Sequence, residues 1–281
     1  MAKTKKKAAS AQRGQIITLV SIVVVLLIIA ALILIKINKP SSAASPTTLA
    51  PADVVAAATS VPASAFSQIG YDPTTPSPAP IKESASLTSA GLPEVLYMGA
   101  DYCPFCAAQR WALVSALSRF GTFSNLGATS SASNDVYPNT QTFSFYGATY
   151  TSKYISFVGV ELQTNIPSNG SYTPLDKPTA QQNKLIATWD VPPYTPNSGG
   201  IPFVDFANKF VLGGAGYNPS IINGLSLQTI AGSLSNTSST PAKAILGTAN
   251  MITATVCKID NNQPAGVCSL SYIQQIEKTL K

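Results

Sequence analysis

The chain has 281 residues, of which 45% are hydrophobic and only 11% are charged, with a formal net charge of +6. Most of the positive excess lies before residue 40, and the rest of the chain carries eleven basic and twelve acidic residues. Nucleic-acid binding needs basic side chains clustered on the folded part, so no nucleic-acid partner is expected. The absence of histidine excludes Ser-His-Asp and Cys-His nucleophile systems and most zinc, copper and non-haem iron sites.

A long apolar run, Ile16–Ile35, follows a basic tail at residues 1–15. A helix of this length spans about 30 Å, the thickness of the hydrocarbon core of a bilayer. The run therefore predicts a single transmembrane helix. The basic residues before it predict a cytoplasmic N-terminus and an extracytoplasmic domain in the cell membrane. A cleaved secretory signal is the alternative, with Ala43-Ala44-Ser45 as a cleavage site.

Residues 36–80 are rich in Pro, Ala, Ser and Thr, which predicts a semi-extended linker in front of a folded domain at residues 81–281. Two parts of this linker are candidates for docking on the domain. Asp53–Thr59 has the pattern of a short helix, and Val61–Gly70 contains apolar residues. A tether that crosses a cell wall and a plain solubilising linker are both consistent with this composition.

A short apolar strand, Val95–Met98, leads through a turn into the motif Cys103-Pro104-Phe105-Cys106 and an apolar helix. Cys103 is thus placed at a helix start, where unpaired backbone N–H groups and the helix dipole stabilise a thiolate. Pro104 suits the first turn, because its missing N–H would have no partner there. Cys106 lies one turn later on the same face and is close enough to attack a mixed disulfide at Cys103. The stretch therefore predicts a redox-active cysteine pair.

Two other interpretations of the pair stay open. Two cysteines three apart form half of a zinc site, or they are buried small apolar side chains without chemistry. The order of strand, CxxC and helix favours redox use, and neither a metal nor a cofactor is predicted. Arg110, two turns into the helix, would add modest positive potential near Cys103, although an arginine on a helix surface is more often simply solvated.

The remaining chain predicts further strands and helices. The expected elements are a hairpin or paired extended segments at Asn139–Thr151, a central strand at Tyr154–Leu162, a helix at Pro178–Trp189, a hairpin at residues 200–212, and helices at Ser226–Leu234, Pro241–Ile259 and Ser269–Leu280.

The order of strand, CxxC helix, strand, helix, then Gly200-Ile201-Pro202 before a hairpin and a terminal helix, resembles the thioredoxin fold. The resemblance implies an α/β domain with a central mixed sheet flanked by helices. It also implies that Pro202 is the cis-proline of a loop facing a Cys103–Cys106 disulfide, with Ile201 beside the disulfide and the loop backbone offered to an extended substrate. An ordinary trans proline at the start of an edge strand is the alternative for Pro202.

Three features depart from thioredoxin. Pro202 follows Cys103 by 99 residues, which requires large insertions. Tyr97 stands where thioredoxin has a buried acid, so help in deprotonating Cys106 is unassigned. The dipeptide Pro104-Phe105 between the cysteines, which Tyr102 and Cys103 precede, is closer to glutaredoxin-like and periplasmic oxidant motifs than to the Gly-Pro of thioredoxin.

At a finer level, the runs YMGADYCPFCAAQRWALVSALSRFGTF, VYPNTQTFSFYGATYTS, IPFVDFANKF and AILGTANMITATVCK resemble a family of membrane-anchored prokaryotic proteins known as domain of unknown function 929. The resemblance covers roughly Asp53 to Cys268. It implies a thioredoxin-like domain and names no substrate.

The other two cysteines, Cys257 and Cys268, lie near the end of one expected helix and before the next. A disulfide closing a loop of this size would stabilise the domain by about 3 kcal/mol in the chain-entropy model. A second redox pair that relays electrons to Cys103–Cys106 is the alternative, and a zinc site built from all four cysteines is a weaker one.

The expected function is thiol–disulfide exchange on protein thiols and disulfides, by a membrane-anchored protein whose Cys103 attacks and whose Cys106 resolves the mixed disulfide. A quinone-linked membrane oxidoreductase is the expected redox partner, because of the predicted membrane setting. The competing hypothesis is a non-catalytic binding protein that grips a partner with the aromatic side chains of an insertion: Phe143, Phe145, Tyr146 and Tyr150. An enzyme needs the Cys103 sulfur exposed beside Pro202, whereas a scaffold can bury it.

Overall fold

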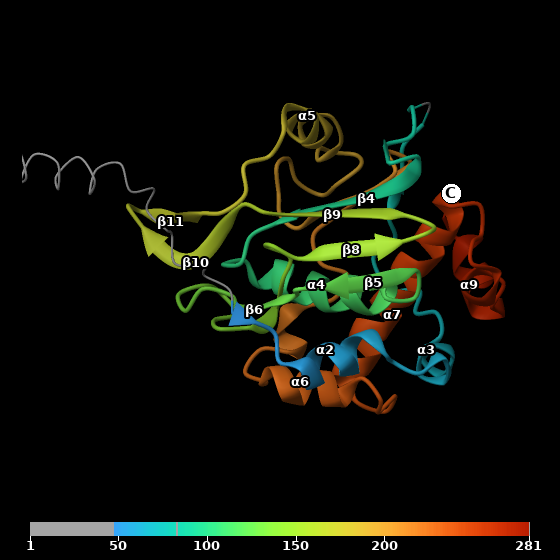
Figure 1. The fold of residues 1–281 in the computed structure, drawn as a ribbon, viewed down its shortest axis with the longest axis horizontal. Coiled ribbons are helices and arrows are strands. Elements are labelled where there is room, and N and C mark those ends of the chain that lie inside the picture. Colours follow the sequence, from blue (N-terminus) through green and yellow to red (C-terminus); the bar gives the residue numbers. More distant parts are fainter. Residues whose placement is uncertain (1–47, 83, 281) are drawn as a thin grey trace, which may run out of the picture. The chain divides into compact units, whose positions relative to one another are not determined.

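The strand that leads into the CxxC motif belongs to a six-stranded sheet (Figure 1). The computed structural model describes residues 48–82 and 84–280. The sheet has the order β2–β13–β12–β4–β3, and β9 also pairs with β4. Its strands are β2 (Ala79–Pro80), β3 (Thr88–Ser89), β4 (Leu92–Gly99), β9 (Ser156–Glu161), β12 (Phe203–Phe206) and β13 (Phe210–Gly213).

Strand β4 is the interior strand on which the sheet is built. Its residues Val95–Met98 are buried, and they pair with antiparallel β12 on one side and parallel β9 on the other. A strand covered on both faces has no water-exposed side, and so its sequence is a continuous apolar run. The predicted strand at Tyr154–Leu162 is β9, and the predicted hairpin is β12–β13, which turns at Ala207 and Asn208, each with a φ of 54°.

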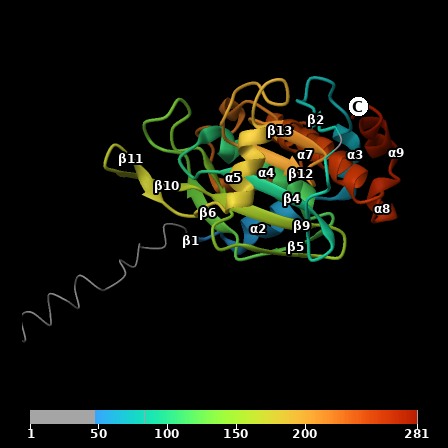
Figure 2. The ribbon, with the colours of Figure 1, turned by 90° about the horizontal axis from the view of Figure 1, so that it is seen from above.

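Helices cover both faces of this sheet, as Figures 1 and 2 show. On one face, Leu96 and Met98 pack with Leu185 and Ile186 of α5 (Ala180–Trp189). On the other face, the alternate residues of β4 pack with α4 (Pro104–Leu117) and α7 (Thr240–Ile259), which also pack against each other. Successive side chains of a strand point to opposite faces of the sheet, so each helical layer packs against every second residue of β4.

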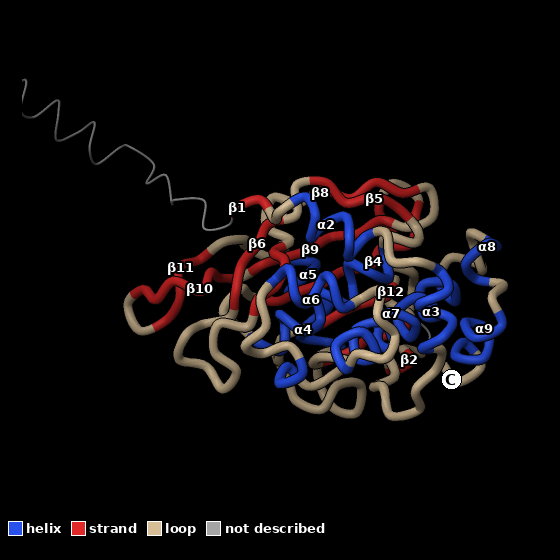
Figure 3. Tube along the Cα trace, turned by 90° about the horizontal axis from the view of Figure 1, so that it is seen from below, coloured by secondary structure: helices blue, strands red, loops and turns tan. Residues whose placement is uncertain are grey.

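The remaining strands form three smaller sheets. These are β1 (Thr48–Leu49) with β6 (Gly127–Ser130) and β7 (Gln141–Ser144), β5 (Gly121–Ser124) with β8 (Thr149–Ser152), and β10 (Gln163–Ser168) with β11 (Ser171–Pro174). Figure 3 shows the β5–β8 pair and the β10–β11 hairpin at separate edges of the domain. The predicted pairing within Asn139–Thr151 is wrong, because β7 pairs with β6 and β8 pairs with β5.

The structure corrects the expected fold class. A thioredoxin-like domain with one central mixed sheet, preceded by a transmembrane helix, was predicted. The described part of the protein is a mixed α/β structure with four sheets, because strands β5 to β8, β10 and β11 pair with one another or with β1 instead of extending the sheet of β4. Within residues 48–82 and 84–280, no helix is both long enough and apolar enough to cross a membrane.

That last finding also corrects the predicted location. The sequence predicted a single-pass protein of the cell membrane with an extracytoplasmic domain, and the structure gives this no support. The apolar run Ile16–Ile35, on which the prediction rested, lies outside the described residues, as do residues 1–15 and 36–47.

Much of the expected linker is folded. Residues 52–69 form α2 (Ala52–Thr59) and α3 (Ala63–Ile69). Helix α2 packs against α4 and against α6 (Leu227–Ser233), and α3 packs against α7. Asn250 of α7 donates from Nδ2 to the carbonyl oxygens of Phe66 and Gly70, at 2.9 and 2.8 Å. The folded unit therefore begins well before residue 81.

The predicted helix at Ser269–Leu280 is α9 (Ser271–Glu277), and a short helix that was not predicted, α8 (Ala265–Cys268), precedes it. A short helical segment at Pro219–Ile221 precedes α6. The expected disulfide between Cys257 and Cys268 is present, with both sulfurs buried. It joins the last turn of α7 to α8 and holds the C-terminal helices on the domain.

Candidate active site

The CxxC motif lies where β4 turns into α4. Cys103 is the N-cap of α4, and its Sγ accepts a hydrogen bond from the backbone N–H of Cys106 at 3.3 Å. Pro104 is the first helical residue, as its missing N–H allows. Cys103 and Cys106 are both free thiols in the structure, so it represents the dithiol form of the pair. The sulfur of Cys103 therefore lies where a helix stabilises negative charge.

The two thiols of the motif differ in acidity. Hydrogen bonding from Cys106 lowers the pKa of the Cys103 thiol, in spite of the burial that opposes this shift. Burial raises the pKa of the Cys106 thiol well above its ordinary value. A thiolate therefore forms first at Cys103, and Cys106 holds its proton.

The loop that precedes β12 lies against Cys103. The Ile201–Pro202 peptide bond is cis, and the thiol of Cys103 lies 3.7 Å from the carbonyl oxygen of Ile201. The structure thus brings together Cys103, Cys106, Ile201 and Pro202, four residues that the sequence singled out from two segments 98 residues apart.

Access to the motif is narrow. Cys103 is 6% exposed, and Cys106 is fully buried. The position of Cys103 beside Ile201 is the one that an enzyme needs, whereas its small exposed fraction is closer to that of a scaffold. A partner sulfur can reach Cys103 only through a restricted opening.

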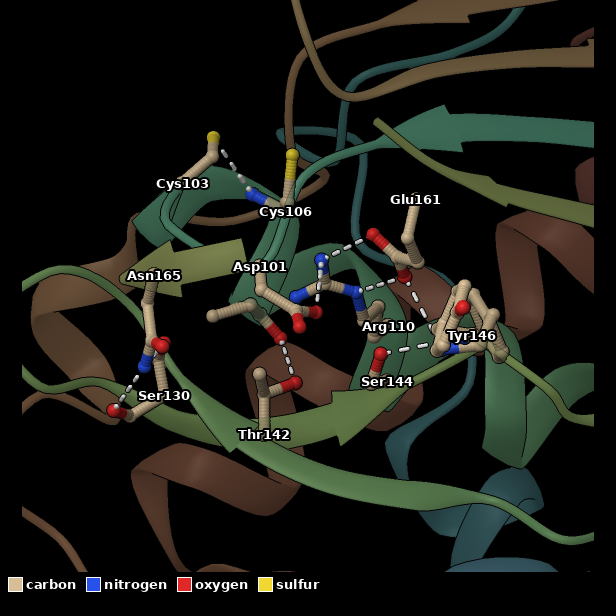
Figure 4. A network of polar contacts seen from close by, with 12 residues as sticks. Asp101, Cys103, Cys106, Arg110, Ser130, Thr142, Ser144, Tyr146, Glu161 and Asn165 are labelled. Atoms are coloured by element: carbon tan, nitrogen blue, oxygen red, sulfur yellow. Dashed lines mark hydrogen bonds and ion pairs between the residues drawn. The ribbon is translucent and has the colours of Figure 1, made fainter. Parts of the chain in front are cut away.

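A buried cluster of charged side chains lies beneath the motif (Figure 4). Arg110, one turn after Cys106 on α4, donates from Nε and Nη2 to the two carboxylate oxygens of Glu161, at 2.7 and 2.6 Å. Its Nη2 also lies 3.4 Å from Oδ1 of Asp101. All three side chains are buried, which excludes the alternative that Arg110 is simply solvated. Its positive charge helps to lower the pKa of Cys103, as predicted.

This cluster carries one positive charge and two carboxylates. Burial raises the pKa of Glu161 to about 7, although Arg110 opposes the shift. Burial likewise raises the pKa of Asp101, again opposed by Arg110. The paired guanidinium is therefore what allows two carboxylates to lie in the interior. The cluster also ties α4 to the end of β9, which fixes the helix that carries the motif.

Tyr97 takes part in the same interior. Its ring lies 5.8 Å from the guanidinium carbon of Arg110, and its hydroxyl is buried without a hydrogen-bond partner. A Cβ at Gly99 would overlap this hydroxyl and lie 3.0 Å from Sγ of Cys106. Glycine at position 99 therefore leaves room for both the Tyr97 hydroxyl and the Cys106 sulfur.

Tyr102, which precedes the motif, and Phe105 within it each contact an aromatic side chain from a segment far along the chain. Tyr102 stacks on Tyr172 of β11 with 4.4 Å between ring centroids and 11° between ring planes. Phe105 meets Tyr137 edge to face at 6.0 Å. Sequence reasoning identified Tyr102 and Phe105 but missed Tyr137, Tyr172, Asp101 and Glu161. No local pattern marks Tyr137, Tyr172 or Glu161, because each lies 30 or more residues along the chain from the side chain that it contacts. Asp101 lies closer in sequence to Arg110.

The zinc sites considered as alternatives from the sequence are not found in the described part of the chain. No group of three or more His, Cys, Asp or Glu side chains there could hold a metal ion. Cys257 and Cys268 are bonded to each other, so they are not free to join Cys103 and Cys106 around a zinc ion.

Comparison with known proteins gives a family but no activity. Residues 81–177, which include the CxxC motif, match the family described as domain of unknown function (DUF929). This segment of the chain is similar to that family. No curated protein and no solved structure matches the chain significantly. The match agrees with the resemblance carried by the sequence motifs. It leaves the function of the site to be argued from its geometry.

Proposed function

We propose that this protein is a thiol–disulfide oxidoreductase acting on protein thiols and disulfides. The observation that carries the proposal is the placement of Cys103: its sulfur caps α4, has the lowered pKa of the pair, and lies 3.7 Å from the Ile201 carbonyl oxygen. A cysteine at a helix N-terminus with a second cysteine one turn away is the arrangement that exchange chemistry needs.

The proposed reaction has two steps. The Cys103 thiolate attacks one sulfur of a substrate disulfide, so that a bond forms between the two sulfurs and the second substrate sulfur leaves as a thiolate that takes up a proton. Cys106, after losing its proton, attacks Sγ of Cys103 and releases the first substrate sulfur as a thiol. The substrate disulfide is reduced and a Cys103–Cys106 disulfide is formed. The reverse sequence oxidises a dithiol substrate.

Repeated turnover needs a second thiol or disulfide partner that restores the pair. The quinone-linked membrane oxidoreductase considered from the sequence depended on a membrane placement that the structure does not support. A protein dithiol or disulfide is the partner class that fits the proposed chemistry.

A second function, that of a non-catalytic binding protein, is favoured by one observation, the 6% exposure of Cys103. The aromatic side chains proposed for partner binding do not favour it. Phe143 and Phe145 are buried in the core, and Tyr150 donates from its hydroxyl to the carbonyl oxygen of Leu117 at 2.9 Å. These rings stabilise the domain itself.

The redox equilibrium of the folded protein distinguishes the two functions. We expect Cys103 and Cys106 to interconvert reversibly between dithiol and disulfide in graded dithiothreitol buffers, read by acid quenching, alkylation and peptide mass spectrometry. The buried Cys257–Cys268 disulfide should stay oxidised throughout. Cys106→Ala is the control, because it cannot form the internal disulfide. A Cys103–Cys106 pair that stays dithiol in every buffer would favour the binding protein.

A further inference from the structure

Exposed apolar side chains occur in the CxxC motif and in two segments that contact its residues. Among residues 48–82 and 84–280, four large hydrophobic side chains are exposed: Leu49 (69%), Phe105 (39%), Val136 (67%) and Ile166 (48%). Phe105 belongs to the motif. Val136 lies in the loop at residues 131–140, and Ile166 lies in β10 of the β10–β11 hairpin.

The loop and the hairpin are attached to the motif and to each other. The N–H of Ala132 donates to the carbonyl oxygen of Tyr102 at 2.9 Å, and Tyr102 stacks on Tyr172 of the hairpin. Asn165 donates from Nδ2 to the carbonyl oxygen of Ser130 at 2.9 Å, a contact visible at the edge of the site in Figure 4. Val136 and Ile166 are therefore carried on one framework that is fixed beside Cys103.

This framework is almost free of charge. Residues 131–140 and 163–174 contain no Lys, Arg or Glu and only one Asp, Asp135. Such a surface offers no ionic recognition to a charged small thiol, and it suits an uncharged partner. We call Phe105, Val136 and Ile166 the apolar rim.

Phe105 also lines a groove. It has a volume of about 720 Å³, and its walls include Pro196, Gly213, Gly214 and Tyr217. A smaller cavity that shares Pro196, Gly213 and Gly214 reaches Ile201. Open surface thus continues from Phe105 of the motif and from Ile201 of the facing loop, and a polypeptide can follow this surface, whereas a small disulfide does not need it.

We propose that the apolar rim selects the substrate: an extended polypeptide segment whose cysteine is flanked by uncharged aliphatic residues. This inference rests on the proposed exchange function. The narrow access to Cys103 agrees with an extended segment, because a flat folded surface would not deliver a sulfur into a restricted opening. Burying aliphatic side chains against Val136 and Ile166 supplies the binding free energy.

The test uses two short synthetic peptides that differ only in the residues flanking one cysteine, Leu and Val in one and Ser and Gly in the other. Each cysteine carries a thionitrobenzoate group in disulfide linkage. Attack by Cys103 forms the bond to the peptide sulfur and releases coloured thionitrobenzoate. Cys106 then displaces the peptide thiol and forms the Cys103–Cys106 disulfide.

We expect the reduced protein to react about ten-fold faster with the aliphatic peptide than with the polar one. The double variant Val136→Ser, Ile166→Ser should lose about ten-fold on the aliphatic peptide alone. Leu49→Ser is the matched control, since Leu49 is at least as exposed as Val136 and Ile166 and lies outside the loop and the hairpin. Methyl methanethiosulfonate, a small uncharged reagent, should modify Cys103 at the same rate in all three proteins.

Equal rates with the two peptides, or an equal loss on both in the double variant, would overturn the role of the apolar rim and leave exchange intact. Failure of the wild-type protein to release thionitrobenzoate from either peptide would instead overturn the proposed function, and the substrate inference with it. Replacing exposed side chains changes stability little, and thermal unfolding of the double variant checks this directly.

Discussion

Arg110→Met is expected to lower the free energy of unfolding by about 3–5 kcal/mol at pH 8. The substitution removes the guanidinium that donates twice to Glu161 and lies 3.4 Å from Asp101. Methionine fills a similar volume, so the main loss is the cation that compensates two buried carboxylates. Urea denaturation at several pH values measures the effect.

The loss should depend on pH in a defined direction. Without Arg110, burial favours the protonated carboxyls of Glu161 and Asp101, so their folded-state pKa values lie above those of the unfolded chain. A carboxyl with a raised pKa stabilises the folded state at low pH, and this contribution is lost as the pH rises through the folded pKa. The variant should therefore be closer to wild type at pH 5 than at pH 8.

The double variant Arg110→Met, Glu161→Gln is the control for this prediction. Glutamine keeps an acceptor for the N–H of Phe145, which donates to Glu161 at 3.2 Å, and it removes one of the uncompensated charges. We expect the double variant to be more stable than Arg110→Met alone. A loss in Arg110→Met below about 1 kcal/mol, the range of an exposed ion pair, would contradict the stabilising role of the cluster.

The second large effect concerns the reactivity of the two cysteines. We expect alkylation of Cys103 by iodoacetamide to rise with pH around a midpoint below about 8.5, the value of an ordinary thiol. The thiolate is the reacting form, and hydrogen bonding from Cys106 lowers the pKa of Cys103. Cys106, whose pKa is raised by burial, should react about 100-fold more slowly or not at all.

The midpoint of the rate against pH reports the pKa of the Cys103 thiol. Restricted access lowers the alkylation rate by the same factor at every pH, so it leaves this midpoint unchanged. Peptide mass spectrometry assigns the alkylated cysteine at each pH. Cys106→Ala keeps the backbone N–H that donates to Cys103 but removes the thiol, so its midpoint should move part of the way toward the ordinary value. A Cys103 midpoint at or above that of the urea-unfolded protein would contradict the account.

Some of the site is predictable from local sequence. An apolar strand followed by CxxC and a helix fixes Cys103 as an N-cap, because this depends only on neighbouring residues. The β12–β13 hairpin is equally local, since Ala207 and Asn208 form its turn. Pro202 could be linked to Cys103 only through the resemblance to the thioredoxin fold, and the structure places it beside the motif within a different arrangement of sheets.

Other features depend on contacts that the sequence does not mark. Glu161 continues an apolar strand, and only its pairing with Arg110, 51 residues away, explains a carboxylate in the interior. Composition favoured a linker at residues 36–80, yet Val54 and Phe66 are buried against the domain. Tertiary packing decided these positions, and local propensity is a weak guide in such cases.

Trapping of a mixed disulfide tests the central claim, exchange at Cys103, most directly. Cys106→Ala, Cys103→Ala and wild-type protein are reduced and incubated with a peptide disulfide, quenched with acid, and analysed by intact and peptide mass. The account predicts a peptide adduct that accumulates on Cys103 in Cys106→Ala, is resolved to the internal disulfide in wild type, and is absent in Cys103→Ala. An adduct absent from Cys106→Ala, or carried by Cys106 in Cys103→Ala as readily as by Cys103, would contradict it.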